Sequence, residues 1–103
     1  MSLTKPQRHQ SKKLRDSARG QDCLIRSPKC NGDPETTVLC HLGGGGMATK
    51  QSDYKAAFGC SSCHDLVDGR TGHEYSPHFV TQIHQEGALR TLDYWYDNGI
   101  LKL

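Results

Sequence analysis

Five cysteines constrain this chain more than any other feature of its sequence. The chain has 103 residues, of which 34% are hydrophobic, so its apolar core must be small. Such a chain needs a further source of stability, either a disulfide framework or a bound metal. Its first residues are polar and basic, with no apolar segment behind them, and we therefore expect a cytoplasmic protein. Thiols stay reduced there, and an odd number of cysteines fits no closed disulfide set, so metal binding is favoured.

Four of the cysteines have a spacing that predicts one structural zinc ion. Two residues separate Cys60 from Cys63, and this spacing directs two thiolates at one tetrahedral ion. Cys23 and Cys30 enclose a loop that contains Pro28, and they complete a set of four thiolates. Two other interpretations stay open: a thioredoxin-like redox pair, although no βαβ pattern surrounds it, and buried cysteines without a ligand.

The charge pattern predicts a basic arm over residues 1–20 and a single domain over 21–103. The first 20 residues carry six basic side chains and one acidic side chain, a local charge of +5, whereas the remaining residues sum to −3. Such an arm suits a phosphate backbone, although it could equally be a solvated terminus. No stretch approaches the roughly 18 apolar residues of a membrane span, so we expect no membrane partner.

Turn and capping signals predict an α+β domain. We expect a short helix over residues 11–19, a small β unit over 21–42 in which turn residues separate two apolar runs, and a glycine-rich loop at 43–46. Ser76 and Pro77 predict the start of a long helix, and Asn98-Gly99 predicts its end. The apolar stripe of this helix is expected to be core and consists of Val80, Ile83, Gly87, Leu92, Trp95 and Tyr96.

Two histidines make the predicted zinc module a candidate enzyme. His41 ends a strand-like run, in which the preceding Cys40 should face the opposite side as a small buried residue. His64 directly follows Cys63, and Asp68 lies four residues further on, so both share one face if this segment is helical. An imidazole and a carboxylate on one face can hold a divalent cation. The alternatives are that His64 is a zinc ligand or a plain exposed residue.

Together these pieces resemble an HNH endonuclease motif, the ββα-metal finger. The motif combines a histidine at a strand end, a loop with glycines, a polar residue before a CxxC pair and a histidine directly after that pair. All four features are found here. They are His41, residues 43–46, Asp53 and CSSCHDLVDGRT at 60–71. More closely, SARGQDCLIRSPKCNGDPETTVLCH and CSSCHDLVD resemble the YbcO-type proteins of prophages, a family assigned as nucleases. The likeness spans about residues 14–103.

The resemblance implies a small zinc-stabilised ββα-metal finger that hydrolyses phosphodiester bonds, in DNA, with Mg²⁺ or another divalent cation. His41 would remove a proton from the attacking water, and His64 would bind the catalytic cation with help from Asp68 or Asp53. Many HNH proteins have an acidic ligand directly before the first histidine, where this chain has Cys40. The basic side chains expected to contact nucleic-acid phosphates are Lys12, Lys13, Arg15 and Arg19.

Two other functions stay open at this stage. The first is a non-catalytic, zinc-ribbon-like module that binds nucleic acid through the basic arm together with Arg26, Lys29 and Arg70. The second is an adaptor protein whose zinc stabilises a surface for a protein partner. Both a monomer and a homodimer are compatible with the sequence.

Overall fold

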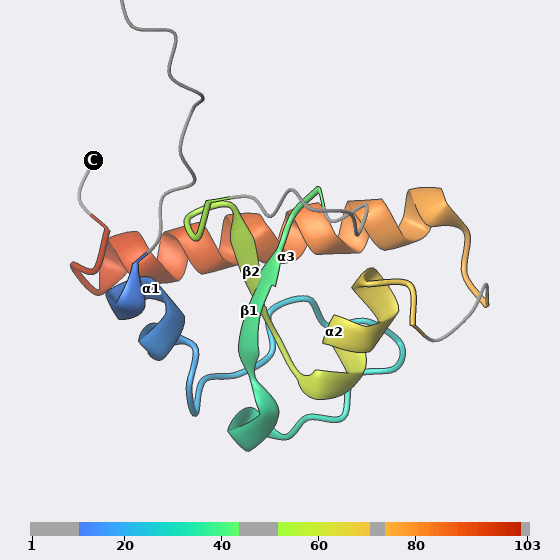
Figure 1. The fold of residues 1–103 in the computed structure, drawn as a ribbon, viewed down its shortest axis with the longest axis horizontal. Coiled ribbons are helices and arrows are strands. Elements are labelled where there is room, and N and C mark those ends of the chain that lie inside the picture. Colours follow the sequence, from blue (N-terminus) through green and yellow to red (C-terminus); the bar gives the residue numbers. More distant parts are fainter. Residues whose placement is uncertain (1–10, 44–51, 71–73, 102–103) are drawn as a thin grey trace, which may run out of the picture.

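The computed structural model describes residues 11–43, 52–70 and 74–101. Figure 1 shows two short strands at the centre, with α3 running along the whole length of the molecule and α1 and α2 on either side. In chain order the elements are α1 (Lys12–Ser17), the 3₁₀ turn η1 (Pro34–Thr36), β1 (Val38–His41), β2 (Ala56–Gly59), α2 (Ser61–Val67) and α3 (Pro77–Asp97). The predicted α+β class, with a helix near the C-terminus, is confirmed.

The sheet consists of two antiparallel strands followed directly by a helix. Val38 pairs with Gly59 at one end of the sheet and His41 pairs with Ala56 at the other. All four residues of β2 are buried, so the small residues of this strand allow close packing on both of its faces. The order β1, β2, α2 is the one that the ββα resemblance predicts.

The β unit predicted over residues 21–42 is confirmed for its second apolar run, which lies in β1, and is wrong for its first. Leu24 and Ile25 form no strand, because their N–H groups both donate to the single carbonyl of Phe58, at 2.8 and 3.2 Å. The chain therefore crosses the end of β2 instead of running beside it. The turn signal at Asp33 is used differently, since its carboxylate accepts a hydrogen bond from the N–H of Glu35 and caps η1. The true partner of β1 lies after the glycine-rich loop.

The long helix begins and ends where its caps predict. The hydroxyl of Ser76 accepts a hydrogen bond from the N–H of Phe79, and Asn98 is the C-cap. The predicted core stripe is confirmed for Ile83, Gly87 and Trp95, which are buried. It is wrong for Tyr96, which is 57% exposed because it lies about 100° around the helix from Trp95.

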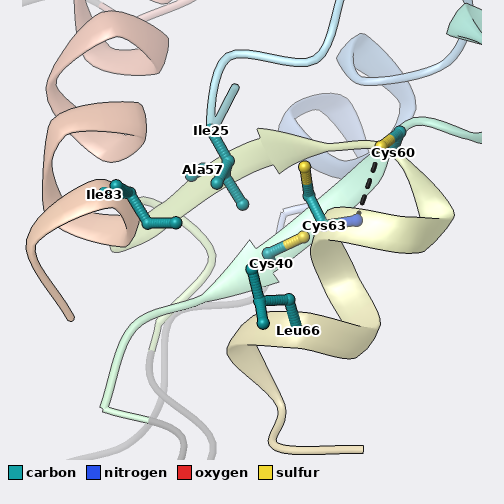
Figure 2. Close-up of a cluster of buried hydrophobic side chains, with 7 residues drawn as sticks. All are labelled: Ile25, Cys40, Ala57, Cys60, Cys63, Leu66 and Ile83. Carbon is teal, nitrogen blue, oxygen red and sulfur yellow. Dashed lines mark hydrogen bonds between the residues drawn. The ribbon is translucent and has the colours of Figure 1, made fainter. Parts of the chain in front are cut away.

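Two clusters of buried side chains form the core. Figure 2 shows the first, in which α2, α3 and both strands meet; it consists of Ile25, Cys40, Ala57, Cys60, Cys63, Leu66 and Ile83. The second joins α1 to the sheet and to the end of α3, and consists of Leu14, Ala18, Leu39, Ala56, Phe58 and Trp95. The indole N–H of Trp95 also donates to the hydroxyl of Ser17 at 2.7 Å. Residues 11–20 of the predicted arm therefore pack with the domain, while residues 1–10 lie outside the described residues.

No helix within the described ranges combines the length and the apolar character that a bilayer crossing requires.

Candidate metal centre and active site

Four cysteines from distant parts of the chain converge on one point. The sulfurs of Cys23, Cys30, Cys60 and Cys63 all lie within 4.8 Å of one another. Two of these separations are 3.5 Å, from Cys23 to Cys63, and 3.9 Å, from Cys30 to Cys60. Four sulfurs placed tetrahedrally at about 2.3 Å from a zinc ion lie about 3.8 Å apart. This four-cysteine cluster therefore fits a zinc ion closely.

Backbone N–H groups surround the sulfurs of the four-cysteine cluster. Cys60 is the N-cap of α2, and its sulfur accepts the N–H groups of Cys63 and Asn31, each at 3.4 Å (Figure 2 draws the Cys63 bond). The hydroxyl of Ser27 lies 3.0 Å from the sulfur of Cys63. Such donors stabilise negative charge on sulfur, as thiolate ligands of a cation require.

Hydrogen bonds and burial shift the pKa values of three thiols of the four-cysteine cluster, Cys23, Cys30 and Cys63. The hydrogen bond between Cys23 and Cys63 lowers the pKa of Cys23 to about 4, whereas it raises the pKa of Cys63 together with burial. Burial also raises the pKa of Cys30. A bound dication would supply the positive charge that lets all four carry a negative charge at once.

The fifth cysteine, Cys40, lies in the first core cluster and not in the four-cysteine cluster. Its side chain is fully buried beside Leu66 (Figure 2), and burial raises its pKa, so the thiol is neutral. Cys40 thus behaves as the small buried residue that the sequence predicts, and it offers no ligand where many HNH proteins have an acid.

His41 and Asp53 form a close pair at the end of β1. The Nε2 atom of His41 lies 2.8 Å from Oδ1 of Asp53, which is fully buried. The other carboxylate oxygen accepts the backbone N–H of Ser11 at 2.6 Å and lies 3.5 Å from Nε of Arg15. Both oxygens of Asp53 are therefore engaged, one by the histidine and one by α1. The residues at 44–46, where the sequence predicts a glycine-rich loop, lie outside the described residues.

His64 and Asp68 share one face of α2, as their spacing predicts. Nε2 of His64 lies 3.3 Å from Oδ2 of Asp68, and Nη2 of Arg70 lies 3.4 Å from the same oxygen. Within the ranges that the structure describes, the four-cysteine cluster is the one group of three or more side chains arranged to hold a metal ion. Asp53 therefore does not join His64 and Asp68 in such a group.

A third histidine near these pairs was missed by the sequence reasoning. His84 of α3 is 8% exposed, and its Nε2 atom lies 2.8 Å from the carbonyl oxygen of Cys40. Burial lowers the pKa of His84. His84 precedes Gly87 by three residues and Thr91 by seven, so helical periodicity alone could have placed it on the buried face.

The structure places three of the four predicted phosphate-contacting side chains in one groove. Lys12, Arg15 and Arg19 line an open groove of about 440 Å³ beside β1, named here the α1–β1 groove, and His41 lies in the same groove. Lys13 is exposed on α1 and is not among the residues that line it. Two of the basic residues expected to bind nucleic acid in the non-catalytic module are paired with acidic side chains. Lys29 lies 3.0 Å from Glu74, and Arg70 pairs with Asp65 and Asp68. Arg26 is exposed.

Comparisons with known proteins agree on one family. A family model described as "Putative nuclease YbcO" matches residues 12–100. Two relatives, "Putative nuclease YbcO" of Escherichia coli (strain K12) and the protein of the same name from Enterobacteria phage 82, are each 42% identical over 93 residues, which cover 86% of this chain and 96% of theirs. A solved structure, titled "Structure of a putative bacteriophage protein from Escherichia coli str. K-12 substr. MG1655", is 36% identical with a TM-score of 0.72, over 84% of this chain and all of that one.

Proposed function

Because the chain belongs to the family described as "Putative nuclease YbcO", we propose that it is a metal-dependent endonuclease of the HNH type. It hydrolyses phosphodiester bonds, with DNA as the substrate. The observation that carries this proposal is the pair of His41 and Asp53 at the end of β1, joined at 2.8 Å within a β1, β2, α2 unit.

His41 acts as the general base. When Nε2 carries the proton and donates it to the buried carboxylate of Asp53, the other ring nitrogen, Nδ1, has a lone pair that can accept a proton from water. The negative charge of Asp53 also stabilises the imidazolium that forms. We therefore assign Asp53 to the positioning of His41 and not to the catalytic cation.

His64 and Asp68 are the residues that would hold the catalytic cation. Their facing atoms lie 3.3 Å apart, close to the roughly 3 Å between neighbouring ligands of an octahedral ion at about 2.1 Å. Mg²⁺ commonly takes only one or two protein ligands and fills its other positions with water and substrate oxygens. When bound, the cation neutralises negative charge that develops on the phosphate.

The four-cysteine cluster has a structural role in this proposal. Four thiolates complete the coordination of a zinc ion and leave no open position for a substrate. The cluster joins the loop that carries Cys23 and Cys30 to the start of α2, and so holds the helix of His64 in place. In a chain with a small core, zinc binding would form a large share of the folding free energy.

The test compares plasmid cleavage by the wild type, His41→Ala and His78→Ala. His78 is an exposed histidine of α3 and serves as the matched control. With Mg²⁺ or Mn²⁺, the wild type and His78→Ala are expected to nick supercoiled DNA at similar rates, while His41→Ala loses nearly all activity. Equal nicking by the wild type and His41→Ala would refute the mechanism. If none of the proteins cuts DNA or RNA but all bind DNA with a steep salt dependence, the non-catalytic binding module is favoured instead.

A further inference from the structure

The α1–β1 groove brings basic side chains to the proposed catalytic base. Its volume is about 440 Å³, and its walls come from α1 on one side and from residues 37–39 on the other. Lys12, Arg15 and Arg19 line it from the helix side, and His41 belongs to the same lining. A ligand that fills this groove would therefore touch the positive charges of α1 and reach the base.

The three basic residues reach the groove from α1 and from the turn that follows it. Lys12 and Arg15 are three positions apart on α1, which places their side chains on one face of the helix, and Arg19 directly follows the C-cap Ala18. Lys13 lies about 100° around the helix axis from Lys12 and is absent from the lining. Asp16 also lines the groove and pairs with Lys12 at 2.8 Å on the exposed surface. Three positive charges and one negative charge leave a net positive groove.

The strand side of the groove is apolar, with one unusual hydroxyl. Val38 is 43% exposed, although it belongs to a strand. Thr37 is 2% exposed, and its hydroxyl has no hydrogen-bond partner in the part of the chain that the structure describes. A buried hydroxyl without a partner calls for an explanation, and a water or a ligand that completes the site is a common one. An apolar wall opposite a basic wall suits a nucleic-acid strand, which has apolar sugar and base faces and a charged backbone.

Arg15 connects the groove with the catalytic pair. Its Nε atom lies 3.5 Å from the buried carboxylate of Asp53, while about half of its side chain is exposed. A guanidinium group has five N–H donors, so Arg15 can keep its contact with Asp53 and still donate to a phosphate. A phosphate held by Arg15 would lie close to Asp53 and to its partner His41.

We propose that the α1–β1 groove binds the phosphate backbone of a single nucleic-acid strand and leads it to His41. Lys12, Arg15 and Arg19 make the phosphate contacts, and Lys13 makes none. This inference rests on the proposed function, because His41 marks the end of the path. It goes further because it names the basic side chains that contact phosphate and the groove along which the strand lies.

The test measures binding of a labelled single strand and a labelled duplex by fluorescence anisotropy without added divalent cation. All proteins carry His41→Ala, so that cleavage cannot interfere. On this background, Lys12→Ala and Arg19→Ala are compared with Lys13→Ala, which removes one positive charge from the first turn of α1. The slope of log K against log salt is negative, and losing one phosphate contact reduces its magnitude by about 0.7 for a single strand and 0.9 for a duplex. At 0.1 M salt this corresponds to about five- to eightfold weaker binding.

We expect this loss for Lys12→Ala and Arg19→Ala, and less than about a twofold change for Lys13→Ala. Circular dichroism and zinc content identify any variant that fails to fold, and Lys12→Gln and Arg19→Gln then replace the alanine variants. Equal weakening by Lys13→Ala and Arg19→Ala overturns the proposal, as does unchanged binding in all three. These binding results are independent of cleavage by the wild type. If the wild type cuts DNA while the groove variants bind normally, the groove proposal is refuted and the proposed function stands. If the wild type never cuts DNA but Lys12→Ala and Arg19→Ala weaken binding, the groove proposal is supported and the proposed nuclease function is refuted.

Discussion

The substitution Asp53→Asn tests whether a buried carboxylate holds His41 in its active form. Oδ1 of Asp53 lies 2.8 Å from Nε2 of His41, and Oδ2 accepts the N–H of Ser11 at 2.6 Å. Asparagine has almost the same size but offers one acceptor oxygen in place of two. It can keep the oxygen for Ser11 only by turning its NH₂ group toward His41. A donor at that place favours the tautomer in which Nε2 has the lone pair and Nδ1 carries the proton.

Two magnitudes follow from this geometry. Hydrogen bonds to a charged group contribute about 1.5–3 kcal/mol each and neutral ones about 0.5–1.5 kcal/mol, and Asp53 is fully buried, so removing its charge should lower the free energy of unfolding by about 1–3 kcal/mol. For a domain of this size, each kcal/mol corresponds to a Tm decrease of about 4–8 °C. Activity should fall further, by about 10²–10⁴ in kcat, because Nδ1 of His41 can no longer accept the proton from water.

The assay compares initial cleavage rates of the wild type, Asp53→Asn and Asp93→Asn at a temperature well below all three Tm values. Asp93 is an exposed aspartate of α3, so its variant controls for the loss of one negative charge. We expect Asp53→Asn to keep its zinc and its KM while kcat collapses, and Asp93→Asn to resemble the wild type. A folded, zinc-loaded Asp53→Asn protein that cuts DNA within about threefold of the wild-type rate would refute the reasoning.

Three further predictions concern stability. Elemental analysis should find about one zinc per chain and a chelator should unfold the protein; retention of its circular dichroism after complete zinc removal would contradict the structural role of the four-cysteine cluster. Gly87→Ala should lower the free energy of unfolding by about 1–3 kcal/mol in urea titrations, because the new Cβ would lie 3.0 Å from Cα of Ile25; unchanged or higher stability would contradict this packing. Burial lowers the pKa of His84, so the unfolded chain binds more protons and stability should fall as the pH drops below about 6.5. His84→Gln should flatten this dependence, and identical pH profiles would argue against it.

Local signals in the sequence predicted the features that depend on a few neighbouring residues. The cap at Ser76, the CxxC pair of Cys60 and Cys63, and the shared face of His64 and Asp68 all follow from spacings of two to four positions. Each is set by backbone geometry within one or two turns, and the structure places each accordingly. The convergence of Cys23 and Cys30 on this pair was also predicted, because a set of four thiolates has few ways to be completed.

Long-range pairing was the part that sequence reasoning could not supply. Leu24-Ile25 and Val38-Leu39 are similar apolar runs, and the turn residues between them favoured one small β unit that contains both. In the structure both runs contact β2 instead, one through its backbone N–H groups on Phe58 and the other as its strand partner. The all-buried, mostly small residues of β2 have no alternating pattern that would identify the strand from sequence alone.

Asp53 and α1 illustrate how a residue's role depends on contacts that no motif encodes. The sequence placed Asp53 at the polar position of an HNH-like pattern and placed residues 11–20 in a basic arm. In the structure the start of α1 binds the carboxylate through Ser11 and Arg15, while Leu14 and Ala18 anchor the same helix in the core. The basic side chains of α1 are therefore held at a defined position relative to His41. A flexible arm would attract a nucleic acid without orienting it, whereas a packed helix can place a phosphate beside His41, the proposed base.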